Sequence, residues 1–162
     1  MDYLWTPWRF HYVSKGTESD GCIFCEKAAA DPAKDREHLV LYRGRTNYVI
    51  LNLFPYTVGH AMIVPYAHVA DLIETPQETL AEMMTIAKQF QRALKEVYHP
   101  EGYNLGMNIG RCAGAGVEFH VHMHILPRWT GDSNFMTVVG ETRVEPENLT
   151  ATYDKLAGFF RK

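Results

Sequence analysis

The sequence predicts an α+β domain in which an antiparallel sheet of about five strands carries one long helix packed on it. Short runs of β-branched and aromatic residues lie on either side of one long segment with helical periodicity. Their order, strand, strand, strand, helix, strand, strand, is typical of an antiparallel sheet with helices on one face. The chain has 162 residues, 46% of them hydrophobic, which suits a single domain with a sizeable core.

The segments that predict strands share apolar and β-branched residues, and turn-forming residues separate them. The first two should form a hairpin around the turn Gly44-Arg45-Thr46-Asn47. The expected strands cover residues 38–43, 48–53, 61–66 and 103–110, with one more short strand at 135–139.

The clearest helix is expected over residues 76–98. Pro76 suits the first helical position, and Thr75 and Glu78 have the spacing of a capping box. Apolar residues recur at helical spacing and form one stripe, which comprises Leu80, Met83, Met84, Ala87, Phe90, Leu94 and Val97. We interpret the methionines as core residues.

Both ends of the chain extend this single domain. Residues 1–19 are rich in aromatic side chains, and we expect an N-terminal arm that packs on the body or on a second subunit. Substrate stacking is the alternative role for this arm. Residues 130–162 form a C-terminal extension, with a short helix expected at 146–162.

Residues 118–128 should form the strand that carries the chemistry. Apolar residues alternate strictly with three histidines, which are His120, His122 and His124. We expect the apolar set, Phe119, Val121, Met123 and Ile125, to face the core. Imidazoles at i and i+4 on a strand lie about 13 Å apart, whereas zinc–nitrogen bonds measure about 2.1 Å. At least one histidine is therefore free for acid, base or nucleophilic work, and the alternative is a solvated polar face.

Composition excludes several classes. The net charge of −3 and the pI near 6.2 provide no basic surface of the kind that nucleic acid binding needs. No apolar run reaches the length of a membrane span, and the N-terminus lacks a signal peptide pattern, so we expect a cytoplasmic protein without membrane contact. Three cysteines do not make a disulfide framework.

Two motifs could bind ligands. The pair Cys22-x-x-Cys25 can place two thiolates on one metal ion, and it is equally compatible with a thioredoxin-like motif or with two idle thiols. The glycine-rich loop from Gly110 to Gly116 lies just before the histidines, where backbone N–H groups could converge on a phosphate. An ordinary tight turn is the alternative for this loop.

Two ordered segments resemble the histidine-triad (HIT) family. His120-Val121-His122-Met123-His124-Ile125-Leu126 is similar to the family pattern of three histidines alternating with apolar residues. The upstream segment from Leu51 to Pro65 resembles the family's Asn, Pro, Gly-His and Val-x-Pro segment. Residues 128–144 resemble the tail of the bacterial branch that is similar to diadenosine tetraphosphate (Ap4A) phosphorylases. The resemblance implies the HIT fold and a homodimer whose sheets align across two subunits.

The resemblance also implies a metal site. Some branches of the family pair such a Cys-x-x-Cys with two histidines, which here are His68 and His120. Cys22, Cys25, His68 and His120 would then hold one structural zinc ion per chain. A closed set of four ligands leaves His122 and His124 free.

The remaining site residues follow from the same resemblance and from the glycine-rich loop. His122, His124 and His60 would be the catalytic residues, with His122 as the nucleophile. The residues expected to contact a nucleotide substrate are Asn52, Asn108, Gly114, Gly116 and Trp129. Asn52 could instead cap the end of a strand, and Trp129 could have a packing role.

The resemblance implies a two-step nucleotidyl transfer. His122 would attack the α-phosphorus of a nucleotide, and the nucleotidyl-histidine would then pass its group to an acceptor, with no catalytic metal required. We expect dinucleoside polyphosphates such as Ap4A as substrates, with phosphorolysis preferred to hydrolysis. The alternatives are a nucleoside phosphoramidase, a nucleotide hydrolase, or a zinc-stabilised nucleotide-binding module with little turnover. Many members place Gln and then Ser or Thr just ahead of the histidines, where this chain has Gly116-Val117-Glu118-Phe119. A carboxylate near a phosphate site is unfavourable unless it is paired or protonated, so this departure weakens the case for plain hydrolysis.

Overall fold

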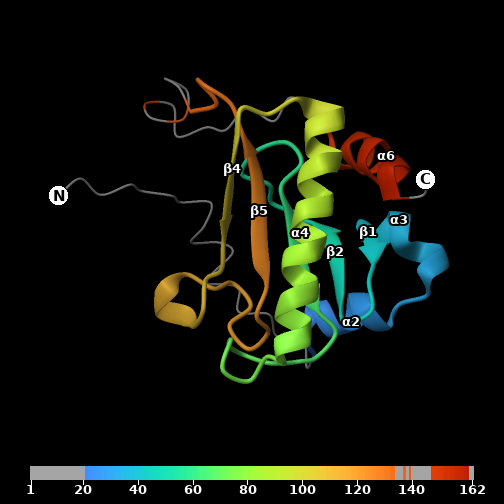
Figure 1. Cartoon of the computed structure of the whole chain (residues 1–162), viewed down its shortest axis with the longest axis vertical. Coiled ribbons are helices and arrows are strands. Elements are labelled where there is room, and N and C mark those ends of the chain that lie inside the picture. The colour runs from blue at the N-terminus through green and yellow to red at the C-terminus, as the bar shows by residue number, and fades with distance from the viewer. Residues whose placement is uncertain (1–20, 134–136, 138, 140–146, 161–162) are drawn as a thin grey trace.

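A computed structural model describes residues 21–133, 137, 139 and 147–160. A five-stranded sheet lies at its centre, with the strand order β1-β2-β3-β5-β4 and antiparallel neighbours throughout (Figure 1). The strands are β1 (Val40–Arg43), β2 (Asn47–Leu51), β3 (Ala61–Pro65), β4 (Gly102–Gly106) and β5 (Met123–Arg128). The helices are α2 (Ile23–Ala29), α3 (Asp35–His38), α4 (Gln77–Tyr98) and α6 (Leu149–Phe160), with 3-10 turns η1 (Pro32–Lys34) and η2 (Arg111–Ala113). The predicted α+β class with five strands and one long helix is confirmed.

The strands are shorter than the sequence predicts, and the backbone conformation of Leu39 explains the late start of β1. Leu39 ends α3 in the left-handed conformation with φ +60°, so β1 can begin only at Val40. β4 stops at Gly106 rather than at residue 110. The strand expected at 135–139 lies largely outside the described residues.

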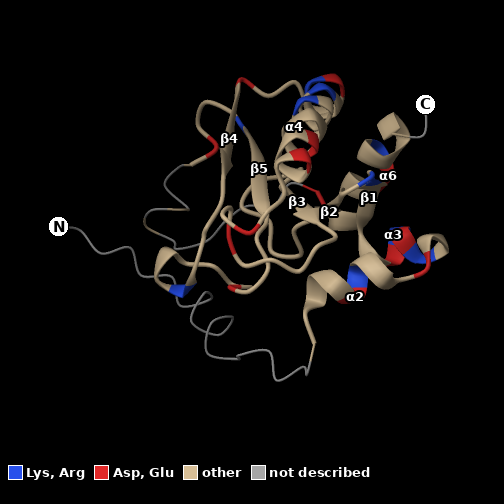
Figure 2. Cartoon of the chain, turned by 60° about the horizontal axis from the view of Figure 1, so that its bottom comes forward, with Lys and Arg blue, Asp and Glu red and all other residues tan. Residues whose placement is uncertain are grey.

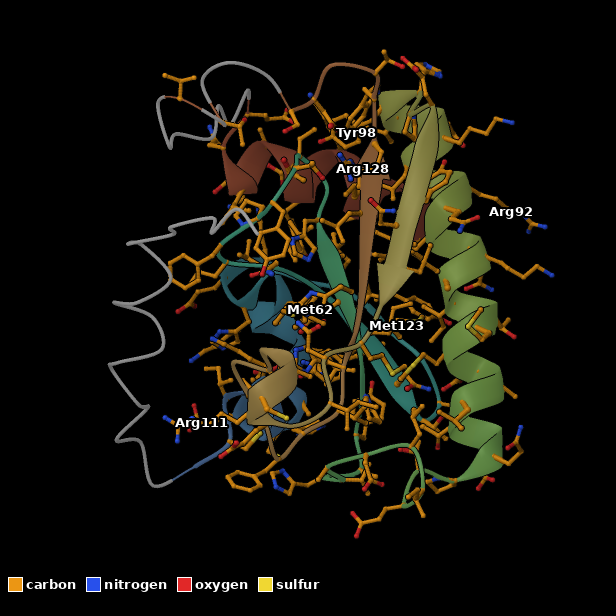
Figure 3. The ribbon with its side chains drawn as sticks, turned by 90° about the vertical axis from the view of Figure 1, so that its left-hand side faces the viewer. Met62, Arg92, Tyr98, Arg111, Met123 and Arg128 are labelled. Carbon is orange, nitrogen blue, oxygen red and sulfur yellow. The ribbon has the colours of Figure 1, made fainter. Side chains whose placement is uncertain are left out.

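Two apolar layers cover the two faces of the sheet. The larger layer joins α4 and α6 to one face, through residues such as Val49, Ile63 and Phe90. The smaller layer packs Phe24 of α2 against Tyr48 and neighbours on the opposite face. Helices therefore cover both faces, and the expectation that all helices share one face is wrong. Figure 3 shows Met62 on the side of α2 and Met123 on the side of α4.

α4 forms one residue later than predicted and without a capping box. Pro76 is the N-cap residue, and no side chain caps the helix. The Thr75 hydroxyl donates instead to the Asp71 carbonyl at 2.6 Å, which removes it from the helix start. Most of the predicted stripe is buried, as Met83 and Phe90 show, but Met84 is 54% exposed and belongs to the surface.

The C-terminal helix α6 belongs to the core. Tyr153, Leu156 and Ala157 are buried in the larger layer, and Phe160 stacks on Tyr42 of β1 with ring centroids 5.0 Å apart. Residues 1–19, the predicted aromatic arm, lie outside the described residues. In the described part, acidic and basic residues are mixed along α4 and α3 (Figure 2). No described helix has the length and apolar character needed to cross a membrane.

The strand that carries the histidines begins later than the alternation predicts. β5 pairs with β3 only from Met123 onward, with Met123 opposite Ile63 and His124 opposite Met62. Upstream, the Val121 amide donates to the Val69 carbonyl at 2.7 Å, so the chain follows the loop after β3. Because the segment before Met123 is not in the sheet, strand alternation fails there, and Phe119 is 65% exposed rather than buried.

Candidate functional site

Four side chains from three parts of the chain form a compact cluster. Cys22 precedes α2, Cys25 lies in its first turn, His68 lies in the loop after β3, and His120 precedes β5. Their ligand atoms all lie within 4.8 Å of one another, and the two Sγ–Nδ1 contacts of Cys22 with His120 and of Cys25 with His68 measure 3.3 Å. A tetrahedral metal centre places sulfur and nitrogen ligands about 3.4–3.8 Å apart. The cluster therefore has the donors and the size to bind one metal ion.

His120 is oriented for metal binding by its second ring nitrogen. Its Nε2 lies 2.9 Å from the Pro65 carbonyl, which can only accept a hydrogen bond. The ring proton is therefore assigned to Nε2, which leaves Nδ1 with a free lone pair toward the two sulfurs. The ring is fully buried, and burial lowers its pKa and keeps it neutral. A neutral imidazole in this orientation suits a metal ligand.

The backbone carbonyl of His120 orients the ring of His122. Nδ1 of His122 lies 2.8 Å from the His120 carbonyl, so Nδ1 carries the proton and donates it. Nε2 of His122 is then unprotonated. Burial lowers the pKa of this ring, although the hydrogen bond to the carbonyl opposes the shift, so the neutral form prevails at pH 7. The side chain is only 4% exposed, and the Phe24 ring lies 4.9 Å away.

His60 and His124 form a chain of hydrogen bonds that fixes a second ring. The Tyr56 amide donates to Nδ1 of His60 at 3.1 Å, which assigns the His60 proton to Nε2. That Nε2 lies 2.9 Å from Nδ1 of His124 and donates to it. The proton of His124 is therefore on Nε2. Burial, aided by His122, lowers the pKa of His124 to about 4, so this ring is neutral as well.

Adjacent imidazoles thus present opposite functions. The rings of His122 and His124 are 5.0 Å apart between centroids. Nε2 of His122 offers a lone pair, and Nε2 of His124 offers a proton. Met62 lies directly opposite His124 across the strands, so both project from the face covered by α2 rather than from the face covered by α4.

Asn52 lies beside this chain of hydrogen bonds. Its Nδ2 lies 3.4 Å from both ring nitrogens of His60, and its Oδ1 accepts the Phe54 amide at 3.0 Å. The second contact closes a turn at the end of β2, which is the strand-end role considered above. The structure therefore brings Asn52 to the histidines and also assigns it a local structural bond.

The glycine-rich loop uses many of its own amides. The amides of Ala113, Gly114 and Ala115 donate to carbonyls of Gly110 and Arg111, which closes η2. Gly114 adopts φ +89°, a conformation that glycine tolerates, so its contribution is conformational rather than that of a free amide. Among the described residues, no group accepts from the amides of Gly116 to Phe119. Figure 3 shows Arg111 of η2 on the same side of the sheet as α2.

Two predicted contact residues are not joined to the histidines. Asn108 is half-buried and has no hydrogen-bond partner in the described part of the chain. Trp129 follows the end of β5, whereas His122 precedes its start, so seven residues of extended chain, about 23 Å, separate them.

A comparison with models of protein families identifies the family of this chain. The model described as HIT domain matches residues 33–131, which is more than half of the chain.

The chain belongs to the HIT family. Its relatives include a protein of Mycobacterium tuberculosis named AP-4-A phosphorylase, which is 37% identical over 97% of this chain and 83% of that protein. The fold is similar to that of a zinc-bound histidine triad family protein from Mycobacterium smegmatis, with a TM-score of 0.69 and 30% identity over 87% and 94% of the two chains. A hypothetical histidine triad nucleotide-binding protein from Sulfolobus tokodaii gives a TM-score of 0.65 and 31% identity over 86% and 89%. These findings confirm the predicted family and the prediction that the chain is a HIT-type enzyme.

Two residues of the HIT site escaped the sequence analysis. Phe24 contacts the rings of both His120 and His122, with centroids 5.4 Å and 4.9 Å away, and so packs between the Cys/His cluster and the His122–His124 pair. Tyr56 places its amide on His60 and its ring 4.8 Å from the His60 ring. The apolar residue inside Cys-Ile-Phe-Cys and the aromatic residue after Pro55 were the available signals.

Proposed function

We propose that this HIT enzyme transfers a nucleotidyl group from a dinucleoside polyphosphate such as Ap4A through a covalent intermediate on His122. One observation carries the proposal: the opposed protonation of the two Nε2 atoms, with a lone pair on His122 and a proton on His124. A nucleophile and a hydrogen-bond donor side by side suit substitution at phosphorus. The name of the Mycobacterium tuberculosis relative supports the choice of substrate.

In the first step, Nε2 of His122 attacks the α-phosphorus. A P–N bond forms, the bond from this phosphorus to the bridging oxygen breaks, and the rest of the polyphosphate leaves with the electron pair. The Nε2–H of His124 donates to the negative charge that develops on an oxygen of the transferred group. The His122 proton stays on Nδ1 and its hydrogen bond with the His120 carbonyl strengthens as the ring becomes cationic.

In the second step, inorganic phosphate attacks the phosphorus of the nucleotidyl-histidine and the P–N bond breaks. Ap4A and phosphate would thus give ATP and ADP, and the lone pair of His122 is restored. The amides of Gly116 to Phe119, which have no acceptor among the described residues, could donate to the phosphate oxygens. Asn52 and Asn108 remain the predicted contacts for ribose and phosphate, and water is the competing acceptor.

The four-residue cluster is proposed as a structural zinc site. Two thiolates and two imidazoles complete a tetrahedral set with no open position, which is typical of a structural rather than a catalytic ion. The zinc-bound neighbour from Mycobacterium smegmatis supports this metal. When bound, the ion would hold α2, the loop after β3 and the start of β5 together. Through His120 it would also fix the carbonyl that orients His122.

A homodimer is proposed on the basis of the sheet order. β4 is an edge strand, and its last three residues, Asn104, Leu105 and Gly106, are exposed, so their outer backbone groups are open to pairing with a second copy. The mass measured by light scattering tests this state. A monomer at micromolar concentration would overturn the proposal.

The decisive experiment is capture of the intermediate. Ap4A with a radioactive α-phosphate, mixed with enzyme and denatured within one turnover, should leave a stoichiometric, acid-labile label on His122. His122→Ala should take up no label and lose at least about 10⁴-fold in kcat. His38→Ala, a substitution outside the site, serves as the control and should label normally. Full turnover by His122→Ala would overturn the proposal.

Product analysis separates the alternatives. With phosphate present, phosphorolysis gives ADP and ATP; hydrolysis gives AMP and ATP. Faster cleavage of adenosine 5′-phosphoramidate than of Ap4A would assign the phosphoramidase function instead. Tight nucleotide binding without label or products would indicate the binding module.

A further inference from the structure

An open hollow with basic side chains lies between α4 and β4. It has a volume of about 340 Å³ and is lined by Lys88, Gln91, Arg92 and Lys95 of α4 and by Tyr103 of β4. Pockets for small molecules span about 300–1,000 Å³, so the hollow suits a small ligand rather than a macromolecule. All three cations of α4 line the hollow, and none of the three acidic residues of this helix does.

The three cations form one row along α4. Lys88 and Arg92 are four residues apart, and Lys95 follows three residues later, so the three side chains share one side of the helix. At 1.5 Å of rise per residue, the row is about 10 Å long. Figure 3 shows Arg92 on the outer side of α4, where its side chain points away from the sheet. The row therefore presents its charges to solvent and to any anion in the hollow.

No described residue neutralises this row. Lys88, Arg92 and Lys95 are exposed, and none of them forms an ion pair or a hydrogen bond within the described part of the chain. Other exposed cations, such as Arg36 and Lys155, do pair with carboxylates. Like charges three or four residues apart destabilise a helix. The helix dipole accounts for Lys95 alone, which lies in the last turn, because its effect falls off within one turn. An anion in the hollow would relieve the repulsion along the row.

The wall of the hollow is held in place by a hydrogen bond between its two elements. The Tyr103 hydroxyl donates to the Gln91 carbonyl at 3.2 Å, and the Tyr103 ring packs on the larger apolar layer. The side-chain amide of Gln91 has no partner among the described residues, so it can donate to an oxygen of a ligand. The hollow is therefore formed before a ligand arrives, and it offers a neutral donor beside the cations.

The hollow is separate from the histidine site. α4 covers one face of the sheet and α2 covers the other, and His124 projects from the face covered by α2. The sheet thus lies between the two sites. A ligand bound at the row of cations does not contact the histidines.

We propose that this hollow binds a short chain of phosphate groups, either free or as the tail of a nucleoside triphosphate. The guanidinium of Arg92 can contact two oxygens of one phosphate, and the ammonium groups on either side can contact the neighbouring phosphates. Nucleic acid fits less well, because the row is only about 10 Å long and the chain has a net charge of −3. The inference rests on the row and the hollow, and it holds whether or not the reaction proposed above is correct.

Titration of the full-length protein with inorganic tripolyphosphate tests the binding. Amide signals in nitrogen-15 NMR spectra locate the ligand, and we expect saturable shifts at residues 88–95 and at Tyr103 with about one tripolyphosphate per chain. Lys88→Gln with Arg92→Gln should raise the Kd by about tenfold or more, because it removes two charged contacts. Tripolyphosphate should also raise the melting temperature of the parent protein more than that of this variant.

A second variant controls for the loss of charge. Lys34→Gln with Arg45→Gln removes the same two positive charges from exposed side chains outside the hollow, which also have no ion pair within the described part of the chain. This control should keep the Kd within about twofold of the parent value, at an ionic strength of about 0.15 M where distant charges are screened. An equal rise of the Kd in both variants would indicate unspecific attraction and would overturn the proposal. Shifts confined to the histidine site would also overturn it.

ATP in the same titration identifies the source of the phosphate chain. At the hollow, tighter binding of ATP than of tripolyphosphate would assign the site to a nucleoside triphosphate. Equal or weaker binding of ATP would assign it to the phosphate chain itself. Both results support the proposal, provided that the Lys88→Gln and Arg92→Gln pair weakens the binding and the control pair does not.

Discussion

Replacing His60 tests whether hydrogen bonds from the fold set the protonation states of His122 and His124. His60 is 1% exposed, accepts the Tyr56 amide and donates to Nδ1 of His124. His60→Phe fills the space but removes the hydrogen bond that each of the two partners makes with His60. His60→Gln retains an amide that can donate to Nδ1 of His124. The two variants therefore differ in the donor rather than in burial.

The magnitude follows from the two lost bonds. Each buried group left unpaired costs about 1–3 kcal/mol, so the two together should lower the free energy of unfolding of His60→Phe by about 2–6 kcal/mol. Without the donor, the proton of His124 no longer has to lie on Nε2. Loss of one preorganised donor at developing charge costs about 2.7–4 kcal/mol, or 10²–10³ in kcat. We therefore expect about a 10²-fold lower kcat for His60→Phe and a loss below about tenfold for His60→Gln.

The assay combines kinetics with a direct view of the proton. Initial rates with Ap4A and phosphate give kcat and KM, and nitrogen-15 chemical shifts of the His124 ring report which nitrogen is protonated. The parent should show protonated Nε2, and the Phe variant should show mixed tautomers. If His60→Phe loses stability yet retains kcat within about threefold, or if the tautomer is unchanged, then His60 is a packing residue and the reasoning fails.

Three further predictions concern pH, the metal and a surface carboxylate. Burial lowers the pKa of His124 from 6.5 to about 4, so the unfolded chain binds more protons in that window. The free energy of unfolding should therefore fall by up to about 3 kcal/mol as the pH drops from 6.5 to 4. Urea titrations should show a smaller fall for His124→Asn than for the parent protein. Equal falls in the two proteins would contradict this prediction. Cys25→Ser should reduce the bound zinc from about one ion per chain and lower the free energy of unfolding by at least about 3 kcal/mol. Elemental analysis measures the zinc, and thermal melting measures the stability. A metal-free parent protein that melts at the original temperature would contradict this prediction. Burial alone would raise the pKa of Glu82, but hydrogen bonds from the Thr46 and Asn47 side chains and from the Thr46 and Arg45 amides lower it to about 2. Glu82→Gln should cost about 1–2 kcal/mol at pH 7 and little at pH 2, and a pH-independent difference would argue against this role.

The metal cluster illustrates how far spacing alone can predict a site. Cys22 and Cys25 are recognisable as a pair because their spacing places both thiols at one helix start. His68 has no such signal, since it is fixed only by the fold of the loop after β3. The family resemblance supplied it, and the structure brings its Nδ1 to 3.3 Å from Cys25.

The protonation states could not be predicted from the sequence. They depend on backbone groups, the Tyr56 amide and the His120 carbonyl, which every residue possesses and no motif marks. Alternation gave the correct face for Met123 and Ile125, which pair with β3, but failed at Phe119, where the chain pairs with a loop. Trp129 was tied to the site by proximity in sequence, although a strand of six residues separates the two.

The border position of β4 affects the segment that follows it. Residues 107–119 leave the sheet along its open side, and η2 within this segment buries none of its side chains. Lengthening or exchanging the part of this segment around η2 would disturb little packing, while His124 is held on β5 opposite Met62 of β3. A single scaffold could therefore change which acceptor molecule it admits by remodelling one peripheral crossover, while the histidine on the sheet stays in place.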